Sequence, residues 1–325
     1  MKKFLKYAML LVIISSMLLL LIYADRYSTI AKEGICLWAL TVVPSLFPFF
    51  FLTMLITGSQ GTLPLSSRLD SFTKKHFRCS GSAVGIFLLS VVSGYPVGAK
   101  LIADLYSGGA IDSDEASRMS TFCSTSGPMF VVGTVGVCMF ESGIYGAAML
   151  ISHIISAIIC GKIFCRIGDF KNHTNIKSKN KTNANILQES MYSSVISILC
   201  VGGFICIFYV LSAMMRDFKI IDFFAFPIGK IMQSHPSSTL LSKGFVTGLI
   251  ECTNGCKILS AVKDPLSASL ACGVISFGGL SVIMQSSVYL TQAKVRLRVF
   301  LLSKLIQCTV AFLLCLCIIK LSDIL

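Results

Sequence analysis

Two lysines in matching strings are the residues of this chain best suited to bind a charged solute. Lys100 stands in Gly-Ala-Lys-Leu and Lys257 in Gly-Cys-Lys-Ile, and each string follows an interruption of an otherwise apolar stretch. An ammonium group is costly inside a membrane, so it is usually functional there. Helix N-termini released by a break favour anions. The pair predicts a site for a small polar solute, anionic or aromatic, which the lysines approach from opposite membrane faces.

Two less specific interpretations stay open at this point. Each lysine lies near the end of its half-helix, so its side chain can reach the membrane interface by snorkelling. The first interruption, at Ser93-Gly94-Tyr95-Pro96, can be a plain loop between two short buried helices, because proline removes a backbone donor and breaks a helix. A loop is expected once, however, whereas breaks in corresponding positions of two halves point to a binding site.

Hydroxyl, amide and carboxylate side chains and several glycines surround the two lysines along the chain. A stripe of small residues follows the first break, and the alternative for it is close helix packing, which is compatible with a cavity wall. The predicted substrate-binding residues are Ser93, Gly94, Tyr95, Pro96, Gly98, Lys100, Ser124, Ser126, Gly127, Glu251, Thr253, Asn254, Gly255, Lys257, Gly278 and Gln285.

No catalytic, metal or cofactor site is predicted. The 14 cysteines lie mostly in apolar runs without paired zinc-ligand spacing, and the four histidines are scattered. His153 lies inside an apolar span, where a hydrogen bond to a neighbouring helix is the more common role. No Gly-x-x-x-x-Gly-Lys-Ser/Thr string is present, so we do not expect ATP-driven transport by this chain. No nucleophile–base pair stands out either, so we do not expect an enzyme.

The composition indicates a polytopic membrane protein. Of 325 residues, 54% are hydrophobic and only 13% are charged, with a mean hydropathy of +0.81; soluble domains carry about 25% charged residues. The net charge of +13 comes from basic residues in short loops between apolar runs. That is the positive-inside pattern rather than the surface of a nucleic-acid-binding protein.

The chain divides into two halves with a basic linker between them. Residues 1–33 hold a retained signal-anchor helix with a cytoplasmic N-terminus, although a cleaved signal peptide is the alternative. The first repeat, 34–168, contains a span over 34–57 kinked or split by Pro44 and Pro48, a basic loop over 59–79, a re-entrant hairpin near 81–108, and helices over 115–138 and 143–167. Residues 169–189 form a flexible cytoplasmic linker.

The second repeat, 190–325, has the same plan in the opposite orientation. It contains spans over 193–215, 266–290 and 300–319, an interfacial aromatic segment over 218–236, and a hairpin near 241–260. Asp112, with Glu115 three residues on, and Asp264, followed by Pro265, are predicted helix N-caps. The predicted fold is an all-α inverted-topology repeat with two re-entrant hairpins. A competing scheme lets 81–108 cross fully and makes 115–137 re-entrant.

Four strings of the first half are distinctive: Gly34-Ile-Cys-Leu-Trp38, Val43-Pro-Ser-Leu-Phe-Pro-Phe-Phe50, Ser93-Gly-Tyr-Pro-Val-Gly-Ala-Lys100 and Cys123-Ser-Thr-Ser-Gly-Pro-Met-Phe130. They resemble the YlbJ family of sporulation integral membrane proteins, which carry the nucleoside-recognition "Gate" domain. The resemblance implies a role in endospore formation: moving dipicolinic acid from the mother cell across the outer forespore membrane. It also implies that the protein lies in the bacterial inner membrane, and in the outer forespore membrane during sporulation.

Three functions from different classes are compatible with these features. The first is a transporter of dipicolinate, with the solute and the lipid bilayer as partners, and with other sporulation membrane proteins or a second copy as further candidates. The second, by analogy with the Gate domain, is a nucleoside or nucleobase carrier. The third is a non-transporting scaffold for spore-envelope assembly, in which substitutions at the hairpin tips would have no effect.

Overall fold

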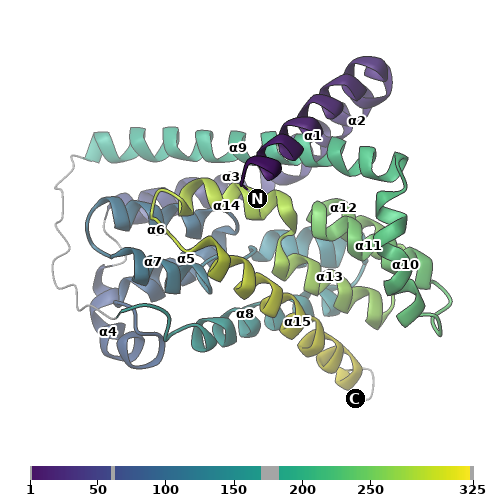
Figure 1. Cartoon of the computed structure of the whole chain (residues 1–325). Coiled ribbons are helices and arrows are strands. Elements are labelled where there is room, and N and C mark those ends of the chain that lie inside the picture. The colour runs from purple at the N-terminus through teal and green to yellow at the C-terminus, as the bar shows by residue number, and fades with distance from the viewer. Residues whose placement is uncertain (1, 60–62, 170–182, 323–325) are drawn as a thin grey trace.

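The computed structural model describes residues 2–59, 63–169 and 183–322, and all regular structure in these ranges is helical (Figure 1). Five helices are long and apolar enough to cross a membrane, and a sixth span is counted if one bent pair is taken as a unit. The prediction of a polytopic all-α membrane protein is confirmed. The five spans are Ala24–Gly58, Gly143–Ile163, Asn185–Asp217, Pro265–Leu290 and Leu297–Leu321.

Two long antiparallel rods form one side of the molecule. After α1 (Lys2–Ile22), the first rod runs through α2 (Ala24–Leu37), the π-helical η1 (Trp38–Val42) and α3 (Val43–Gly58); the second is α9 (Asn183–Asp217). Their pairing is fixed near one end by the Tyr27 hydroxyl, which donates to Asp217 over 3.0 Å, and further along by the Trp38 indole, which donates to the Ile198 carbonyl over 3.0 Å. The span that contains Pro44 and Pro48 is continuous rather than split, and a π turn, η1, lies just before Pro44.

The first half continues with two interrupted segments. After α4 (Leu63–Phe77), α5 (Ser82–Ser93) and α6 (Val97–Ser107) form the predicted hairpin around Gly94-Tyr95-Pro96, whose Tyr95–Pro96 bond is cis. The next segment consists of α7 (Ser113–Ser120), a non-helical stretch over 121–128 and the π-helical η2 (Met129–Met139). The half closes with α8 (Gly143–Ile163).

The second half repeats this order. α10 (Ile220–Ile231) follows α9, and then α11 (Ser238–Ile250) and α12 (Cys252–Leu259) make the second hairpin around Glu251. α13 (Pro265–Phe277) and α14 (Gly279–Leu290) are separated at Gly278, and α15 (Leu297–Ser322) corresponds to α8. Each half therefore contains two interrupted segments, not one.

Three expectations are corrected by this architecture. The helix predicted over 115–138 is broken, because Ser120 and Thr121 bond back to Ser117 and Arg118 carbonyls and Pro128 disfavours helix in the residue before it. The basic loop over 59–79 contains a helix, α4, which an i,i+4 ion pair between Asp70 and Lys74 supports. Of the linker, residues 170–182 lie outside the described ranges, and 183–189 belong to α9.

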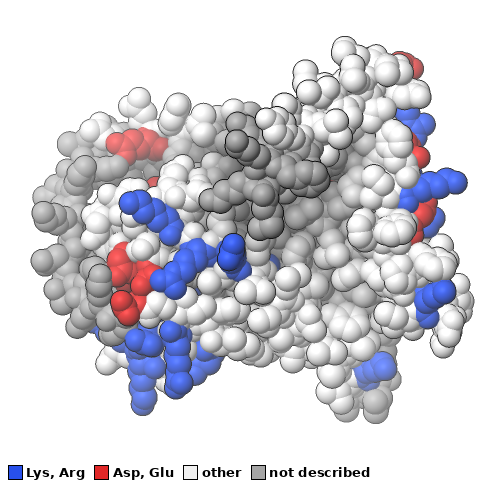
Figure 2. Space-filling model, in the orientation of Figure 1, with Lys and Arg blue, Asp and Glu red and all other residues white. Residues whose placement is uncertain are grey.

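The two hairpins enter the molecule from opposite ends. Figure 1 shows α5 and α6 toward the left and α11 and α12 toward the right. Charged side chains in Figure 2 gather toward the same two ends and leave an uncharged stretch between them. At the right end, Lys263 pairs with Glu141 over 2.6 Å and His235 with Asp264 over 2.7 Å. This is the arrangement that an inverted repeat requires.

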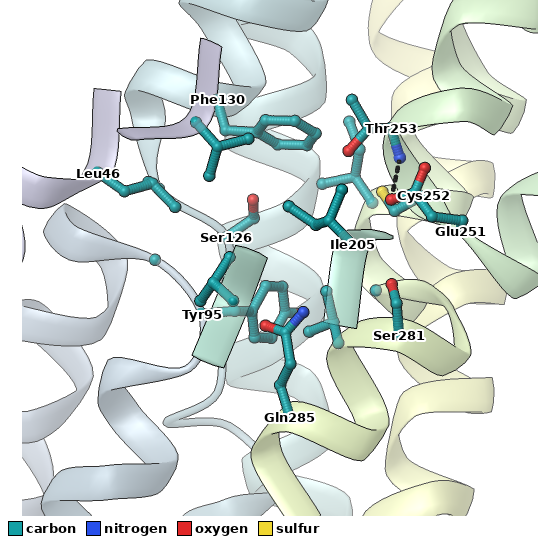
Figure 3. Close-up of a pocket in the computed structure, with 17 residues that line it drawn as sticks. Leu46, Tyr95, Ser126, Phe130, Ile205, Glu251, Cys252, Thr253, Ser281 and Gln285 are labelled. Carbon is teal, nitrogen blue, oxygen red and sulfur yellow. Dashed lines mark hydrogen bonds between the residues drawn. The ribbon is translucent and has the colours of Figure 1, made fainter. Parts of the chain in front are cut away.

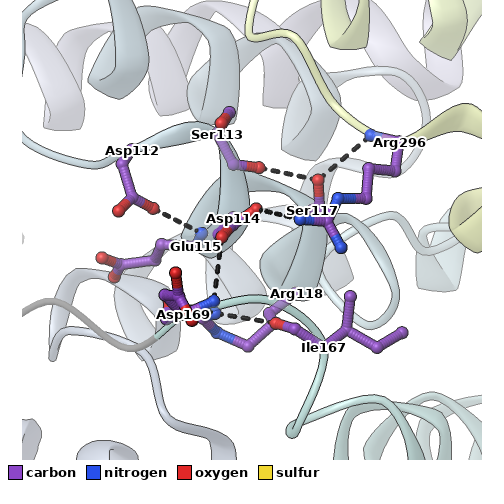
Figure 4. A network of polar contacts seen from close by, with 9 residues as sticks. All are labelled: Asp112, Ser113, Asp114, Glu115, Ser117, Arg118, Ile167, Asp169 and Arg296. Carbon is purple, nitrogen blue, oxygen red and sulfur yellow. Dashed lines mark hydrogen bonds and ion pairs between the residues drawn. The ribbon is translucent and has the colours of Figure 1, made fainter.

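A polar network closes the left end (Figure 4). Asp114 pairs with Arg296 over 2.6 Å and accepts from the Asp169 backbone over 2.9 Å. The buried Arg118 guanidinium donates to the Arg78, Ile167 and Asp169 carbonyls over 2.8–2.9 Å. Three of the basic segments that the charge pattern assigns to one side of the membrane thus meet.

Both predicted N-caps are confirmed. The Asp112 carboxylate accepts from the Glu115 backbone over 2.8 Å at the start of α7. The Asp264 carboxylate accepts from the Ser267 backbone over 2.6 Å, and the Ser267 side chain completes a capping box at the start of α13. The Glu115 carboxylate accepts from the Ser80 backbone over 2.6 Å and so ties α7 to the start of the first hairpin.

Candidate functional site

All four interruptions converge on one interior pocket (Figure 3). Its lining includes Gly94 and Tyr95 from the first hairpin, Ser126 and Gly127 from the α7–η2 break, Glu251 to Thr253 from the second hairpin, and Gly278 from the α13–α14 break. Helical backbone interrupted at membrane depth must be satisfied by protein or by a wet cavity. The pocket is therefore the place where the fold concentrates free backbone groups.

In the first half, the hairpin break lies directly against the break of the next segment. Gly94 has φ +82°, and a β-carbon there would lie 2.9 Å from the Gly127 backbone nitrogen. A side chain at either position would separate the two breaks, because Gly94 tolerates the left-handed backbone and leaves room for the approach. Glycine at both positions lets two interrupted segments share one wall of the pocket.

The second half repeats this close approach. A β-carbon on Gly279, which has φ +72°, would lie 3.0 Å from the Gly248 carbonyl oxygen and 3.1 Å from the Cys252 nitrogen. Within the hairpin, the buried Glu251 carboxylate accepts from the Thr253 and Asn254 backbones over 3.1 and 2.7 Å. Glu251 therefore caps α12 across its own break, where the helix N-terminus partly offsets its charge.

The lining combines apolar walls with a few polar groups. In Figure 3, Tyr95, Ser126 and Gln285 lie on one side, and Glu251 and Thr253 on the other. Among the described residues that line the pocket, Glu251 alone has a charged side chain. The apolar residues of the lining are Val42, Leu46, Phe130, Val201, Ile205, Ile275 and Val282. A few polar groups among apolar walls are typical of a small-molecule site.

A buried lysine stands behind the tyrosine of this pocket. Lys304 of α15 is 1% exposed, and its ammonium donates to the Tyr95 hydroxyl over 3.1 Å, to the Ser124 carbonyl over 2.5 Å and to the Gln307 side-chain oxygen over 2.9 Å. All three oxygens are neutral. The Tyr95 hydroxyl in turn donates to the Ser276 carbonyl over 3.5 Å, so the first hairpin is linked to two other broken segments.

His153 of α8 joins two of the breaks directly. Its Nε2 accepts from the Ser126 backbone N–H over 2.9 Å, and its Nδ1 lies 2.8 Å from the Ser276 hydroxyl. Because Nε2 is an acceptor, the neutral ring carries its proton on Nδ1 and donates it to Ser276. The expectation that His153 hydrogen-bonds to a neighbouring helix is confirmed, and the bonds run to the breaks of both halves.

The structure brings half of the predicted site residues into the pocket. Those that line it are Gly94, Tyr95, Ser126, Gly127, Glu251, Thr253, Gly278 and Gln285. Those outside its lining are Ser93, Pro96, Gly98, Lys100, Ser124, Asn254, Gly255 and Lys257. Ser93 contacts Thr53 through its hydroxyl, and the Ser124 carbonyl binds Lys304.

The structure does not bring the two lysines of the matching strings together. Lys100 turns away from the pocket and contacts the hydroxyl of Ser193 on α9, with the Ser193 carbonyl at 3.5 Å. Lys257 is exposed on α12. Lys100 is the fourth residue of α6 and Lys257 is the sixth of α12, so each lies about one turn or more from the break at which its helix begins. That spacing places both ammonium groups away from the tips, so the expected meeting of the two lysines is corrected.

Lys304 is the charged residue near the site that sequence reasoning missed. It lies in the first turns of a span expected to begin at Phe300, where a lysine is taken for an interfacial anchor. The available signal was the spacing of Lys304 and Gln307, which puts an ammonium and an amide on one face of an apolar helix. An ionisable residue inside a span is a functional-site hypothesis by default.

The comparisons with known proteins agree with the assignment to the membrane. No protein-family model matches the chain, and no solved structure is significantly similar to it. The chain is 26% identical over 300 residues to the Bacillus subtilis (strain 168) protein described as "Sporulation integral membrane protein YlbJ", an alignment that covers 85% of this chain and 74% of that protein. The resemblance seen in the sequence is thereby confirmed: the chain is similar to a sporulation integral membrane protein, and its own long apolar helices are those of an integral membrane protein.

Proposed function

We propose that this protein is a membrane transporter for a small planar anion, with dipicolinate as the favoured solute and the outer forespore membrane as the favoured location. The single observation that carries the proposal is the convergence of four interrupted segments on one pocket, with a buried lysine behind its wall. Interrupted helices that meet from opposite ends are a common plan for the binding sites of secondary transporters.

The charge balance favours an anion. Within the described residues, the hydrogen bonds of Lys304 all go to neutral oxygens, whereas Glu251 already has two backbone N–H groups of α12 as partners. An ammonium buried without a counter-charge is unfavourable, and an anion in the pocket would relieve that cost through the Tyr95 hydroxyl. The apolar walls and the rings of Tyr95 and Phe130 suit the flat faces of an aromatic solute.

Solute binding requires the pocket to widen. Its volume is about 60 Å³, less than half of the roughly 150 Å³ of an engineered cavity that binds benzene. The walls come from both halves of the chain, so a movement of one half against the other changes the volume. Alternating access by such movement is the usual mechanism of inverted-repeat transporters.

A neutral nucleoside or nucleobase is the second candidate. The Gln285 amide, the Glu251 carboxylate and the hydroxyls of Thr253 and Ser281 line the pocket. Together they supply donors and acceptors of the kind that match the edge of a base. This candidate needs no contribution from Lys304, which separates it from the first.

Uptake into liposomes by the purified protein tests both candidates, with labelled dipicolinate and uridine side by side. We expect dipicolinate uptake, and a loss of roughly tenfold or more in Lys304→Met, because hydrogen bonds to a charged group contribute about 1.5–3 kcal/mol. Lys230→Met is the matched control, since Lys230 is exposed on α10 and its variant loses the same charge.

The outcomes separate the three functions. Uridine uptake that is lost in Gln285→Ala and retained in Lys304→Met would establish the nucleoside carrier instead. Uptake of neither solute by folded protein in either direction would contradict transport of these solutes and leave the scaffold function.

A further inference from the structure

The ammonium of Lys304 is surrounded as a metal cation would be. Its oxygen partners are a backbone carbonyl of the α7–η2 break, a phenol and a side-chain amide. Its Nζ also lies 5.0 Å from the centre of the Tyr95 ring and 5.8 Å from that of Phe300. Aromatic faces at these distances attract monovalent cations.

Neutral oxygens released by an interrupted helix are the ligands that transporters use for sodium. Unwound carbonyls and the ends of half-helices coordinate Na⁺ near the bilayer midplane, and hard cations prefer oxygen ligands. Ser124 supplies such a carbonyl at the break. The Ser124 hydroxyl is also buried without a hydrogen-bond partner in the described part of the chain, so a further oxygen at the break is available to a cation.

We propose that Lys304 is a tethered cation that fills an alkali-metal site at the α7–η2 break, so that solute binding and transport need no sodium. A lysine that reaches this position from α15 supplies the positive charge from the chain itself, with no ion to bind or release in each cycle. Removal of its side chain beyond the β-carbon leaves the Ser124, Tyr95 and Gln307 oxygens free to bind Na⁺. The expectation that transport needs no sodium rests on the proposed function. The expectation that Na⁺ binds when the Lys304 side chain is removed does not.

Lys100 provides a matched comparison. Like Lys304 it has a serine partner, but Lys100 is only partly buried, and the Ser193 carbonyl at 3.5 Å belongs to an unbroken helix, α9. Such a carbonyl is already used by the helix and is not free to coordinate an ion. Shortening Lys100 is therefore not expected to create a cation site.

Thermal unfolding of the full-length protein in detergent tests the site without any transport assay. Wild type, Lys304→Ala and Lys100→Ala are compared in NaCl, KCl and choline chloride at equal ionic strength. For wild type, and separately for Lys100→Ala, we expect the unfolding temperature in NaCl to equal that in choline chloride. Lys304→Ala should be stabilised by NaCl over choline by roughly 2 °C or more, the shift given by Na⁺ well above its Kd.

Two results would overturn the proposal: a Na⁺-specific stabilisation of wild type, or a Lys304→Ala variant that responds equally to all three salts. Lys304→Ser is the second variant if the alanine variant yields no folded protein, because its hydroxyl keeps a polar partner for the site. Flux by wild-type liposomes should also be equal with Na⁺ or choline outside. Absence of any flux would contradict the proposed function while leaving the unfolding result to decide the cation site.

Discussion

The two hairpins have the same plan but support their breaks in different ways. At the second, Glu251 caps α12 from within the break itself. At the first, the Tyr95 side chain depends on Lys304, which is 209 residues away, and the adjoining Ser126 backbone depends on His153 of α8. One break is thus satisfied by its own sequence, whereas the other is complete only when both halves have packed. The buried ammonium of Lys304 therefore lies at the first break, whose hydrogen-bond partners come from distant parts of the chain.

The test of whether the two hairpins enter from opposite membrane faces should give the largest difference, because each cysteine is labelled from one side of the membrane and not from the other. Single cysteines are placed at Ser113, beside the first hairpin's exit, and at Ala261, beside the second's, after the 14 native cysteines have been replaced. A membrane-impermeant maleimide should label Ser113→Cys only from the cytoplasmic side and Ala261→Cys only from the other. Labelling of both from one side would remove the inverted relation on which the comparison depends.

The matching glycines of the two strings should show large and similar losses of stability. A β-carbon on Gly98 would overlap the Cys123 carbonyl of the neighbouring segment, and one on Gly255 would overlap the Gly248 backbone of its own hairpin. Gly98→Ala and Gly255→Ala should each cost about 3 kcal/mol or more, because backbone on both sides must shift.

Gly203→Ala is the control for these glycines, since a β-carbon there has no atom within 4 Å; it should be neutral or slightly stabilising. The measurement is thermal unfolding of the purified proteins. Tolerance of alanine at Gly98 with intolerance at Gly255 would show that the α5–α6 hairpin is not packed against 121–128.

Loss of His153, which supports the breaks from α8, and loss of Glu251, which caps its own break, should lower stability by different amounts. The two losses should also differ in how far a conservative substitution recovers the stability. His153→Ala leaves the Ser126 N–H and the Ser276 hydroxyl without their partner and should cost about 3 kcal/mol. Glu251→Ala removes a helix cap and should cost about 1–2 kcal/mol, which Glu251→Asp largely recovers, because aspartate is a favoured N-cap.

Thermal unfolding again supplies the values, and His153→Gln is the matching conservative variant. It should recover little, since its amide cannot reach both segments as the imidazole does. Full recovery by His153→Gln together with no recovery by Glu251→Asp would reverse the distinction between the two breaks.

Local signals predicted most of the fold and about half of the site. Apolar length predicted the spans, Pro96 predicted the first break, and Asp112 and Asp264 predicted helix starts, since each depends on neighbouring residues alone. The break over 121–128 was underestimated because its polar stripe also fits helix packing. The spacing of Lys304 and Gln307 was a local signal, but the partners of Lys304 and the role of His153 were out of reach, because only tertiary packing brings α15 and α8 against the breaks.

The two π-helical turns add a mechanical property to the pocket. Val42 belongs to η1 and Phe130 to η2, and both line the pocket. A π turn bonds i to i+5, so tightening it to the α pattern shifts the register by one residue and rotates the rest of the helix by about 100°. The lining thus contains two segments, η1 and η2, in each of which a register shift would bring a different side chain to face the solute while the backbone stays hydrogen-bonded. The width of the pocket becomes a question of helical register as well as of domain movement.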